Sequence, residues 1–138
     1  MQPKTILIIE DDQALTEAIS LKLDRAGFQP IMMISAEHAM QWLSDHIPDL
    51  IWLDILLPGM SGIDFLEYLR KDERYRSIPV LIVSVSSGPD KMKRAFELNI
   101  IDFISKSDHE IKDVVGQVSA YFEDPTRGGV VAGAQKNT

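Results

Sequence analysis

The stretch Leu50-Ile51-Trp52-Leu53-Asp54 joins a run of four apolar residues to a carboxylate, and Pro58-Gly59 follows after three further apolar residues. A short apolar run bounded by turn residues is typical of a strand that is buried on both faces of a sheet. A second stretch has the same form, because the apolar run 6–9 ends in Glu10-Asp11-Asp12. Two such strands, side by side and parallel, would bring their carboxylates together at one edge of the sheet.

Carboxylates gathered in this way repel one another unless a positive charge lies among them. Two unit charges about 4 Å apart cost roughly 4 kcal/mol at an effective dielectric constant near 20. A small hard cation with oxygen ligands relieves this repulsion, and Mg²⁺ also keeps coordination positions open for phosphate oxygens. The sequence therefore predicts a divalent cation site at this edge.

The rest of the chain alternates short apolar runs with segments of helical period. We predict strands at 6–9, 31–34, 50–53, 80–83 and 100–104, each followed by a helix. Asp12 and Ser35 are predicted to cap the first two helices, and the last helix carries apolar residues at Ile111, Val114, Val115, Val118 and Phe122. Five such units imply an α/β fold in which helices cover both faces of a parallel sheet.

Composition narrows the classes of function. The 138 residues fit one domain, and a net charge of −7, from 14 basic and 21 acidic residues, argues against direct nucleic-acid binding. Without cysteine there are no disulfides, zinc-thiolate sites or thiol nucleophiles. We see no signal peptide and no apolar run near the roughly 18 residues that span a bilayer, so we expect a soluble, cytoplasmic protein without membrane contact. Residues 124–138 have no usable period and are predicted to be a flexible tail or truncated linker after a domain at 1–123.

Four polar residues stand at or just after the carboxyl ends of the predicted strands. They are Asp11, Asp54, Ser84 and Lys106. Ligands of open α/β sheets bind outside these strand ends. Phosphoryl transfer needs these residue types: carboxylates to hold a cation, one more as nucleophile, a hydroxyl donor, and an ammonium to offset charge on the phosphoryl oxygens.

With these motifs the chain resembles the receiver domains of two-component response regulators. The resemblance extends from residue 4 to about residue 122. It rests on Ile6-Leu7-Ile8-Ile9-Glu10-Asp11-Asp12, on 50–62 with Asp54, on Ile78-Pro79-Val80-Leu81-Ile82-Val83-Ser84, and on Asp102-Phe103-Ile104-Ser105-Lys106. It implies a doubly wound, flavodoxin-like fold with five helices and strand order 2-1-3-4-5.

The resemblance also implies a role for each matching residue. Asp54 would accept a phosphoryl group from a phosphohistidine, and Ser84 and Lys106 would hold the phosphoryl oxygens. The ligands of Mg²⁺, or alternatively Mn²⁺, would be Glu10, Asp11, Asp54 and the backbone carbonyl of Leu56. Phe103 occupies the position of the aromatic switch residue of the family.

The partners that the resemblance implies are proteins. A histidine kinase or phosphotransfer protein would supply the phosphoryl group. A downstream protein would bind the face formed by the fourth helix, the fifth strand and the fifth helix, and homodimerisation on phosphorylation stays open. The domain would catalyse only its own phosphorylation and dephosphorylation, so we do not class it as an enzyme.

Val85 and Ser107 depart from the family pattern, and two alternatives to a phosphorylated receiver stay open. Val85 is bulkier than the usual alanine or glycine and could narrow access to the phosphoryl site. A pseudo-receiver that binds partners without phosphorylation therefore stays open as an alternative. Ser107 replaces the usual proline, so the cis peptide bond of the family is in doubt here. A small aspartyl-phosphate phosphatase is the remaining alternative, but such enzymes commonly carry a second acid where this chain has Leu56.

Overall fold

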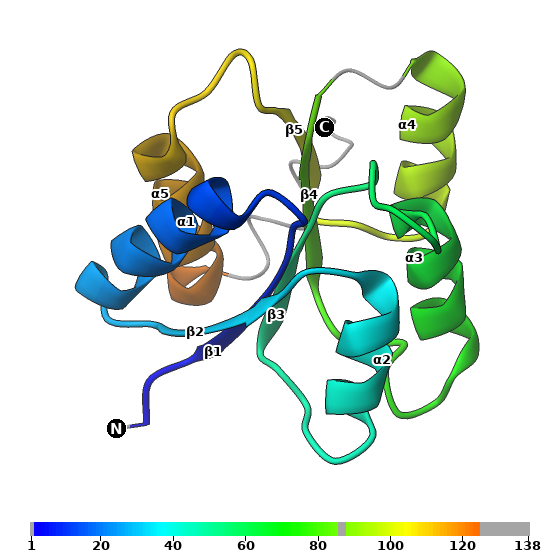
Figure 1. Cartoon of the computed structure of the whole chain (residues 1–138), viewed down its shortest axis with the longest axis horizontal. Helices are drawn as coiled ribbons and strands as arrows, with labels where there is room; N and C mark the ends of the chain where they lie inside the picture. Colours follow the sequence, from blue (N-terminus) through cyan, green and yellow to red (C-terminus); the bar gives the residue numbers. More distant parts are fainter. Residues whose placement is uncertain (1, 86–87, 125–138) are drawn as a thin grey trace.

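Five parallel strands form one sheet in the order β2-β1-β3-β4-β5 (Figure 1). The computed structural model describes residues 2–85 and 88–124. The strands are β1 (Thr5–Ile9), β2 (Gln29–Met33), β3 (Leu50–Leu53), β4 (Val80–Ser84) and β5 (Asp102–Ser105). The strand order and direction that we predicted are confirmed.

A helix follows each strand, and the helices divide between the two faces of the sheet. They are α1 (Gln13–Arg25), α2 (Ala36–Leu43), α3 (Gly62–Lys71), α4 (Pro89–Glu97) and α5 (Ile111–Glu123). Figure 1 shows α1 and α5 on one face and α2, α3 and α4 on the other. Because α5 ends at Glu123, the tail predicted at 124–138 lies, apart from its first residue, outside the described residues.

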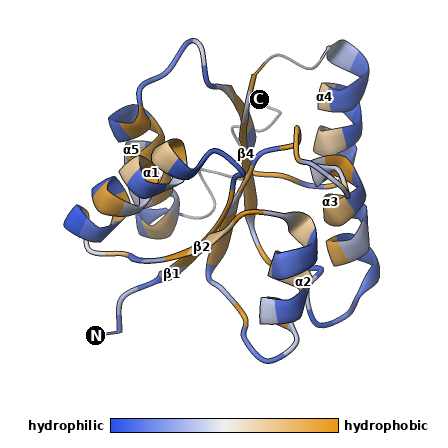
Figure 2. Cartoon of the chain, viewed as in Figure 1, coloured by the Kyte–Doolittle hydropathy of each residue, from blue (hydrophilic) through white to orange (hydrophobic). Residues whose placement is uncertain are grey.

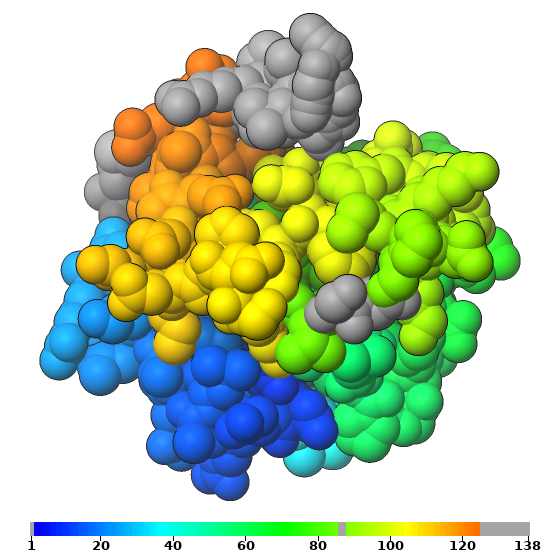
Figure 3. All heavy atoms as spheres, turned by 90° about the horizontal axis from the view of Figure 1, so that it is seen from above, coloured from blue at the N-terminus to red at the C-terminus, as the bar shows by residue number. Residues whose placement is uncertain are grey.

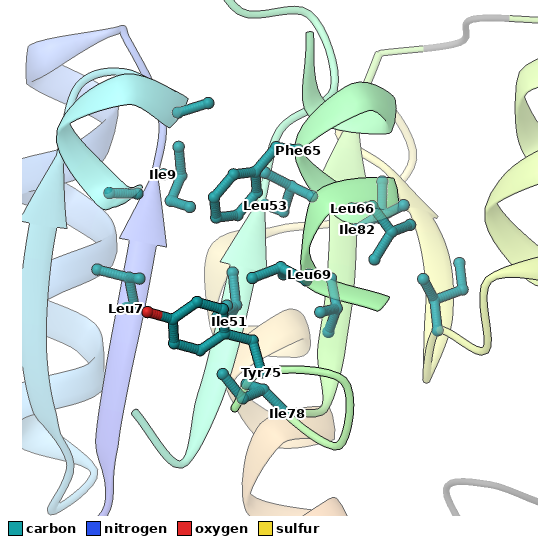
Figure 4. Packing of buried hydrophobic residues seen from close by; sticks show 14 of the residues in the cluster. Leu7, Ile9, Ile51, Leu53, Phe65, Leu66, Leu69, Tyr75, Ile78 and Ile82 are labelled. Atoms are coloured by element: carbon teal, nitrogen blue, oxygen red, sulfur yellow. The ribbon is translucent and has the colours of Figure 1, made fainter. Parts of the chain in front are cut away.

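Each face of the sheet has its own apolar core, because successive strand residues point to opposite sides. In β1, Ile6 and Ile8 belong to the cluster under α1 and α5, whereas Leu7 and Ile9 belong to the cluster under α2 and α3. Figure 2 shows apolar strands between helices whose outer surfaces are hydrophilic. Figure 4 shows the second cluster, in which the Tyr75 hydroxyl donates to the Leu43 carbonyl at 3.0 Å.

β3 has the predicted range, β1 and β4 are each one residue longer, and β2 and β5 differ most. β2 begins at Gln29 and not at 31, since an edge strand tolerates Pro30, which lacks an N–H, and Ile34 beyond its end is 54% exposed. β5 begins at Asp102 and not at 100, because the backbone turns at Asn99 with φ 61° and regular pairing starts only at Asp102. Ile100 is buried although it lies outside β5, and its apolar side chain led to the predicted start of the strand at 100.

N-cap side chains close the amino ends of α1, α2 and α3, and at the start of α5 Asp113 Oδ2 accepts from the Glu110 N–H at 3.3 Å. Asp12 accepts from Leu15 N, and Ser35 accepts from His38 N, so both predicted caps are confirmed. Ser61 accepts from Asp64 N and caps α3 in the same way. α4 differs, because Gly88 precedes it with φ 91° and no side chain caps it.

Arg70 joins the end of α3 to the end of α4. Its guanidinium donates to the carbonyls of Leu98 at 2.7 Å, Ile78 at 2.9 Å, Arg76 at 3.1 Å and Asn99 at 3.3 Å. Burial lowers the pKa of Arg70 from its ordinary value. No carboxylate in the described ranges 2–85 and 88–124 forms an ion pair with it, so backbone oxygens alone hold this side chain.

Candidate phosphoryl-acceptor site

Three carboxylates converge where β1 and β3 end. One oxygen from each of Glu10, Asp11 and Asp54 lies within 4.8 Å of the others. Glu10 and Asp54 are buried, at 1% and 4% exposure, and Asp11 is exposed. Figure 3 looks down on this edge of the molecule, where the blue, green and yellow segments that follow β1, β3 and β5 meet. An all-oxygen set that opens to solvent through one carboxylate suits a hard cation such as Mg²⁺.

Asp54 accepts hydrogen bonds on both carboxylate oxygens. Ser84 Oγ donates to Oδ1 at 2.7 Å, and the backbone N–H of Leu56 donates to the same oxygen at 3.0 Å. Lys106 Nζ donates to Oδ2 at 2.9 Å. These donors come from β4, from the loop after β3 and from the segment after β5, so the fold fixes the orientation of this side chain.

Lys106 also pairs with Glu10. The distance from Nζ to Glu10 Oε1 is 2.5 Å, while Asp12 N donates to Oε2 at 3.1 Å. Burial raises the pKa of Glu10, and the nearby charge of Asp54 adds to this, while the bond from Lys106 only partly opposes them. Burial acts to lower the pKa of Lys106, but the two carboxylates outweigh it and the pKa lies above its ordinary value. One ammonium thus serves two buried carboxylates.

The turn from β3 into α3 requires glycine at two positions, Gly59 in the loop and Gly62 at the start of α3. A side chain at Gly62 would overlap the backbone of Ile55 and come within 2.6 Å of the Asp54 carbonyl oxygen. Gly59 has φ 74°, and a Cβ atom there would lie 2.6 Å from Glu37 Oε2. The sequence PGMSG therefore lets the chain turn close behind the acid cluster.

Glu37 holds this loop from a different element. Its Oε2 accepts from the Met60 N–H at 2.9 Å, and this hydrogen bond lowers the pKa of the Glu37 carboxyl. The sequence analysis missed this contact. The two residues are 23 positions apart, and nothing in the spacing of an acid in the first turn of α2 identifies its partner.

The remaining predicted site residues take different places. Phe103 lies in β5 and packs, partly buried, against the cluster under α2 and α3. Leu56 and Val85 are 43% and 44% exposed, and the role of the Leu56 carbonyl as a metal ligand stays a prediction. No peptide bond within 2–85 and 88–124 is cis, which agrees with the doubt raised by Ser107.

None of the helices in residues 2–85 and 88–124 combines the length and the apolarity that crossing a membrane requires.

Comparisons with known proteins converge on one family. The sequence model of the family described as "Response regulator receiver domain" matches residues 6–115. The phosphate regulon transcriptional regulatory protein PhoB of Escherichia coli (strain K12) is 32% identical over 117 residues, which are 85% of this chain and 51% of that protein. The chain thus spans about half the length of the curated relatives it matches.

Solved structures agree with this match. The signal receiver domain of a signal transduction histidine kinase from Syntrophus aciditrophicus has a TM-score of 0.79 and 29% identity, over 90% of this chain and 93% of that one. The Mn²⁺-bound form of the response regulator Rcp1 has a TM-score of 0.74 and 25% identity, over 88% of this chain and 94% of that one. Both likenesses cover most of this chain and most of the other one.

Proposed function

Because this chain belongs to the response regulator receiver domains of two-component systems, we propose that Asp54 accepts a phosphoryl group from a phosphohistidine. The observation that carries the proposal is the set of donors around one buried carboxylate. Ser84 and Lys106 contact different oxygens of Asp54, so one oxygen can bond to phosphorus while both donors remain beside the phosphoryl group. Receiver domains are signalling proteins, so in this proposal phosphorylation of Asp54 changes how the chain binds another protein.

The side chains that would act on the phosphoryl group are already in contact with one another. An oxygen of Asp54 attacks phosphorus, the phosphorus–nitrogen bond of the donor breaks, and its electron pair stays on the departing imidazole. The Ser84 hydroxyl and the Lys106 ammonium donate to the equatorial phosphoryl oxygens, where charge collects in the transition state. Both donors reach Asp54 at 2.7–2.9 Å without the phosphoryl group, so little reorganisation is needed.

The carboxylates of Glu10, Asp11 and Asp54 would hold a divalent cation, with the Leu56 carbonyl as a further ligand. The ion would neutralise charge on the phosphoryl oxygens and on the acid cluster. The fit of the oxygen donors supports Mg²⁺, and the Mn²⁺-bound form of Rcp1 supports Mn²⁺ as an alternative.

The signal would leave through α4, β5 and α5. Movement of the Ser84 hydroxyl toward a phosphoryl group would free space for Phe103 to turn inward, which would alter that face for a protein partner or for a second copy of the chain. Support comes from the position of Phe103 in β5 and from the packing of α4 against that strand. A histidine kinase or phosphotransfer protein is the proposed donor. With a net charge of −7 we propose no direct nucleic-acid contact for this chain.

The decisive experiment uses acetyl phosphate, or beryllofluoride, with Mg²⁺. The native chain is expected to gain one phosphoryl group by mass spectrometry, and Asp54→Asn is expected to gain none. Asp24→Asn, an exposed acid on α1, is the control that should behave as the native chain does. Absence of any adduct in native protein would favour the pseudo-receiver, and release of phosphate over many turnovers would favour the phosphatase.

A further inference from the structure

A small cavity lies on the α1/α5 face of the sheet, among side chains of the cluster under those two helices. Its volume is about 70 Å³. Its walls come from α1, β3, β4, the segment after β5 and α5, and are Leu15, Ile19, Trp52, Val83, Lys106, His109, Ile111 and Val114. None of the three clustered carboxylates lines the cavity, but Lys106 lines it and also contacts Glu10 and Asp54.

The indole of Trp52 gives this cavity an unusual wall. Trp52 is 1% exposed, and its Nε1 is buried without any hydrogen-bond acceptor in the described part of the chain. Buried N–H groups of this kind almost always have a partner in native proteins. An acceptor atom brought in by a ligand would satisfy this donor.

The other polar groups on the wall are already engaged. Lys106 Nζ bonds to Glu10 and Asp54, and His109 Nδ1 lies 3.1 Å from the Ser105 carbonyl oxygen. The remaining walls are aliphatic side chains, which disfavour an ion because they cannot replace its hydration. A water molecule needs two to four polar partners, and the indole N–H is the one donor here that has none.

We propose that this cavity binds a small neutral molecule with a short apolar body and one oxygen acceptor, such as a three- or four-carbon ketone or alcohol. The apolar body would contact Ile19, Val83 and Val114, and the oxygen would accept from Trp52 Nε1. The volume is roughly that of two water molecules at about 30 Å³ each, so only a molecule of a few non-hydrogen atoms fits. Because the stem of Lys106 forms part of the wall, the occupant also touches the residue that bridges the two buried carboxylates.

The test uses acetone as the probe and nuclear magnetic resonance as the readout. Acetone is expected to shift three sets of signals with one saturable curve: the Trp52 indole N–H, the Val114 methyl groups and the side-chain carbons of Lys106. For a molecule of this size the Kd is expected in about the millimolar range. This readout requires no phosphoryl transfer, so it stands whether or not Asp54 is phosphorylated.

Two variants separate the site from solvent effects. Ile111→Phe, at the partly exposed rim, fills the cavity, and Trp52→Phe removes the donor while keeping an aromatic ring. Each is expected to weaken binding at least tenfold, with the Val114 methyl groups as the readout for Trp52→Phe. Leu21→Phe makes a similar change at an exposed position of α1 outside the cavity and should leave the Kd unchanged.

Non-saturating shifts, or equal shifts in native protein and Ile111→Phe, would overturn the proposal. So would a water molecule held in the cavity by Trp52, detected as a nuclear Overhauser effect from its indole N–H that persists in saturating acetone. Thermal unfolding of both variants confirms that they are folded before their titrations are compared. Saturable binding that Ile111→Phe abolishes would support the site.

Discussion

Lys106 is the single cation among the described residues that contacts the two buried carboxylates, and this imbalance sets the chemistry of the site. Its ammonium lies 2.5 Å from Glu10 and 2.9 Å from Asp54. Attraction to one ammonium only partly offsets the cost of taking two carboxylates out of water. The raised pKa of Glu10 is the direct expression of this cost. The site therefore favours any further positive charge that reaches it.

The charge on Glu10 is expected to destabilise the metal-free protein at neutral pH. Glu10→Gln keeps the shape and one oxygen acceptor but removes the buried charge, so it should raise the free energy of unfolding at pH 7. Because the pKa of Glu10 is higher in the folded state than its ordinary value of 4.5, protonated Glu10 favours the folded state. This contribution to stability is complete below pH 4.5 and is lost as the pH rises through the folded-state pKa. The advantage of Glu10→Gln should therefore shrink as pH falls toward 4.5.

Urea unfolding of both proteins without divalent cations, at pH 7 and pH 4.5, measures this difference. A Glu10→Gln variant that is less stable than the native chain at pH 7 would contradict the argument.

At the scale of single residues, the sequence predicted which polar groups gather but not what holds them. Asp11, Asp54, Ser84 and Lys106 could be placed because the carboxyl ends of parallel strands share one edge of the sheet. The bond from Glu37 to Met60 could not, since it joins two segments whose distance depends on how α2 packs. The cavity beside Trp52 could not be predicted from the sequence either, because a void depends on how side chains pack and not on the spacing of apolar residues.

The turn between β3 and α3 shows how one element positions the site. Gly62 follows the cap Ser61 and lies directly against Ile55 and Asp54. The first turn of α3 can approach the end of β3 this closely only because Gly62 has no side chain. The turn then leaves the Leu56 N–H in place to donate to Asp54.

Gly62→Ala is expected to lower the free energy of unfolding by about 1–3 kcal/mol, because the added methyl group meets backbone atoms that cannot move aside. Gly116→Ala, in the exposed interior of α5, is the matched control. No atom beyond its own stretch of helix lies within 4 Å of the added Cβ, and alanine favours the helix by about 0.5–1 kcal/mol, so this variant should be more stable. Chemical denaturation of the two variants gives opposite signs if the account is correct, and equal effects would refute it.

Glu37→Ala is expected to loosen the β3–α3 loop without unfolding the domain. The Met60 amide loses its acceptor and should exchange with deuterium several-fold faster, whereas Glu37→Gln keeps a carbonyl oxygen and should protect it. Hydrogen exchange resolved at Met60 measures this. Equal exchange in both variants would show that the carboxylate does not hold the loop.

The elements themselves were predictable where periodicity and burial agree. The central strands β1, β3 and β4 are buried almost throughout and matched their apolar runs closely. The outer strands β2 and β5 are only partly buried, and their limits were misplaced by up to two residues at either end. An edge strand has one neighbour, so its sequence is less constrained than that of a central strand.

For the whole molecule, charge links stability to the ions present. The net charge is −7, and three of the acids, Glu10, Asp11 and Asp54, lie together at one edge of the sheet. A cation that binds only the folded cluster stabilises the chain by mass action. The fold and its ion are therefore expected to be thermodynamically coupled.

Mg²⁺ is expected to raise the melting temperature, and the rise should continue with the logarithm of the Mg²⁺ concentration above Kd. Asp11→Asn removes an exposed ligand and should abolish most of the shift, whereas Asp24→Asn should retain it. Differential scanning calorimetry at constant ionic strength is the measurement. An equal shift in the Asp11→Asn variant would mean that the ion acts elsewhere.

The hydrogen bonds from Arg70 hold the carboxyl end of α4, whereas no side chain caps its amino end. The carbonyl oxygens around its guanidinium carry no titratable charge, so neither acid nor moderate salt should release the grip on Leu98 and Asn99. The opposite end begins at an uncapped Gly88, a few residues after Ser84. A helix held at its carboxyl end is expected to move most at its amino end, so any displacement of α4 should be largest at Pro89 and smallest at Glu97.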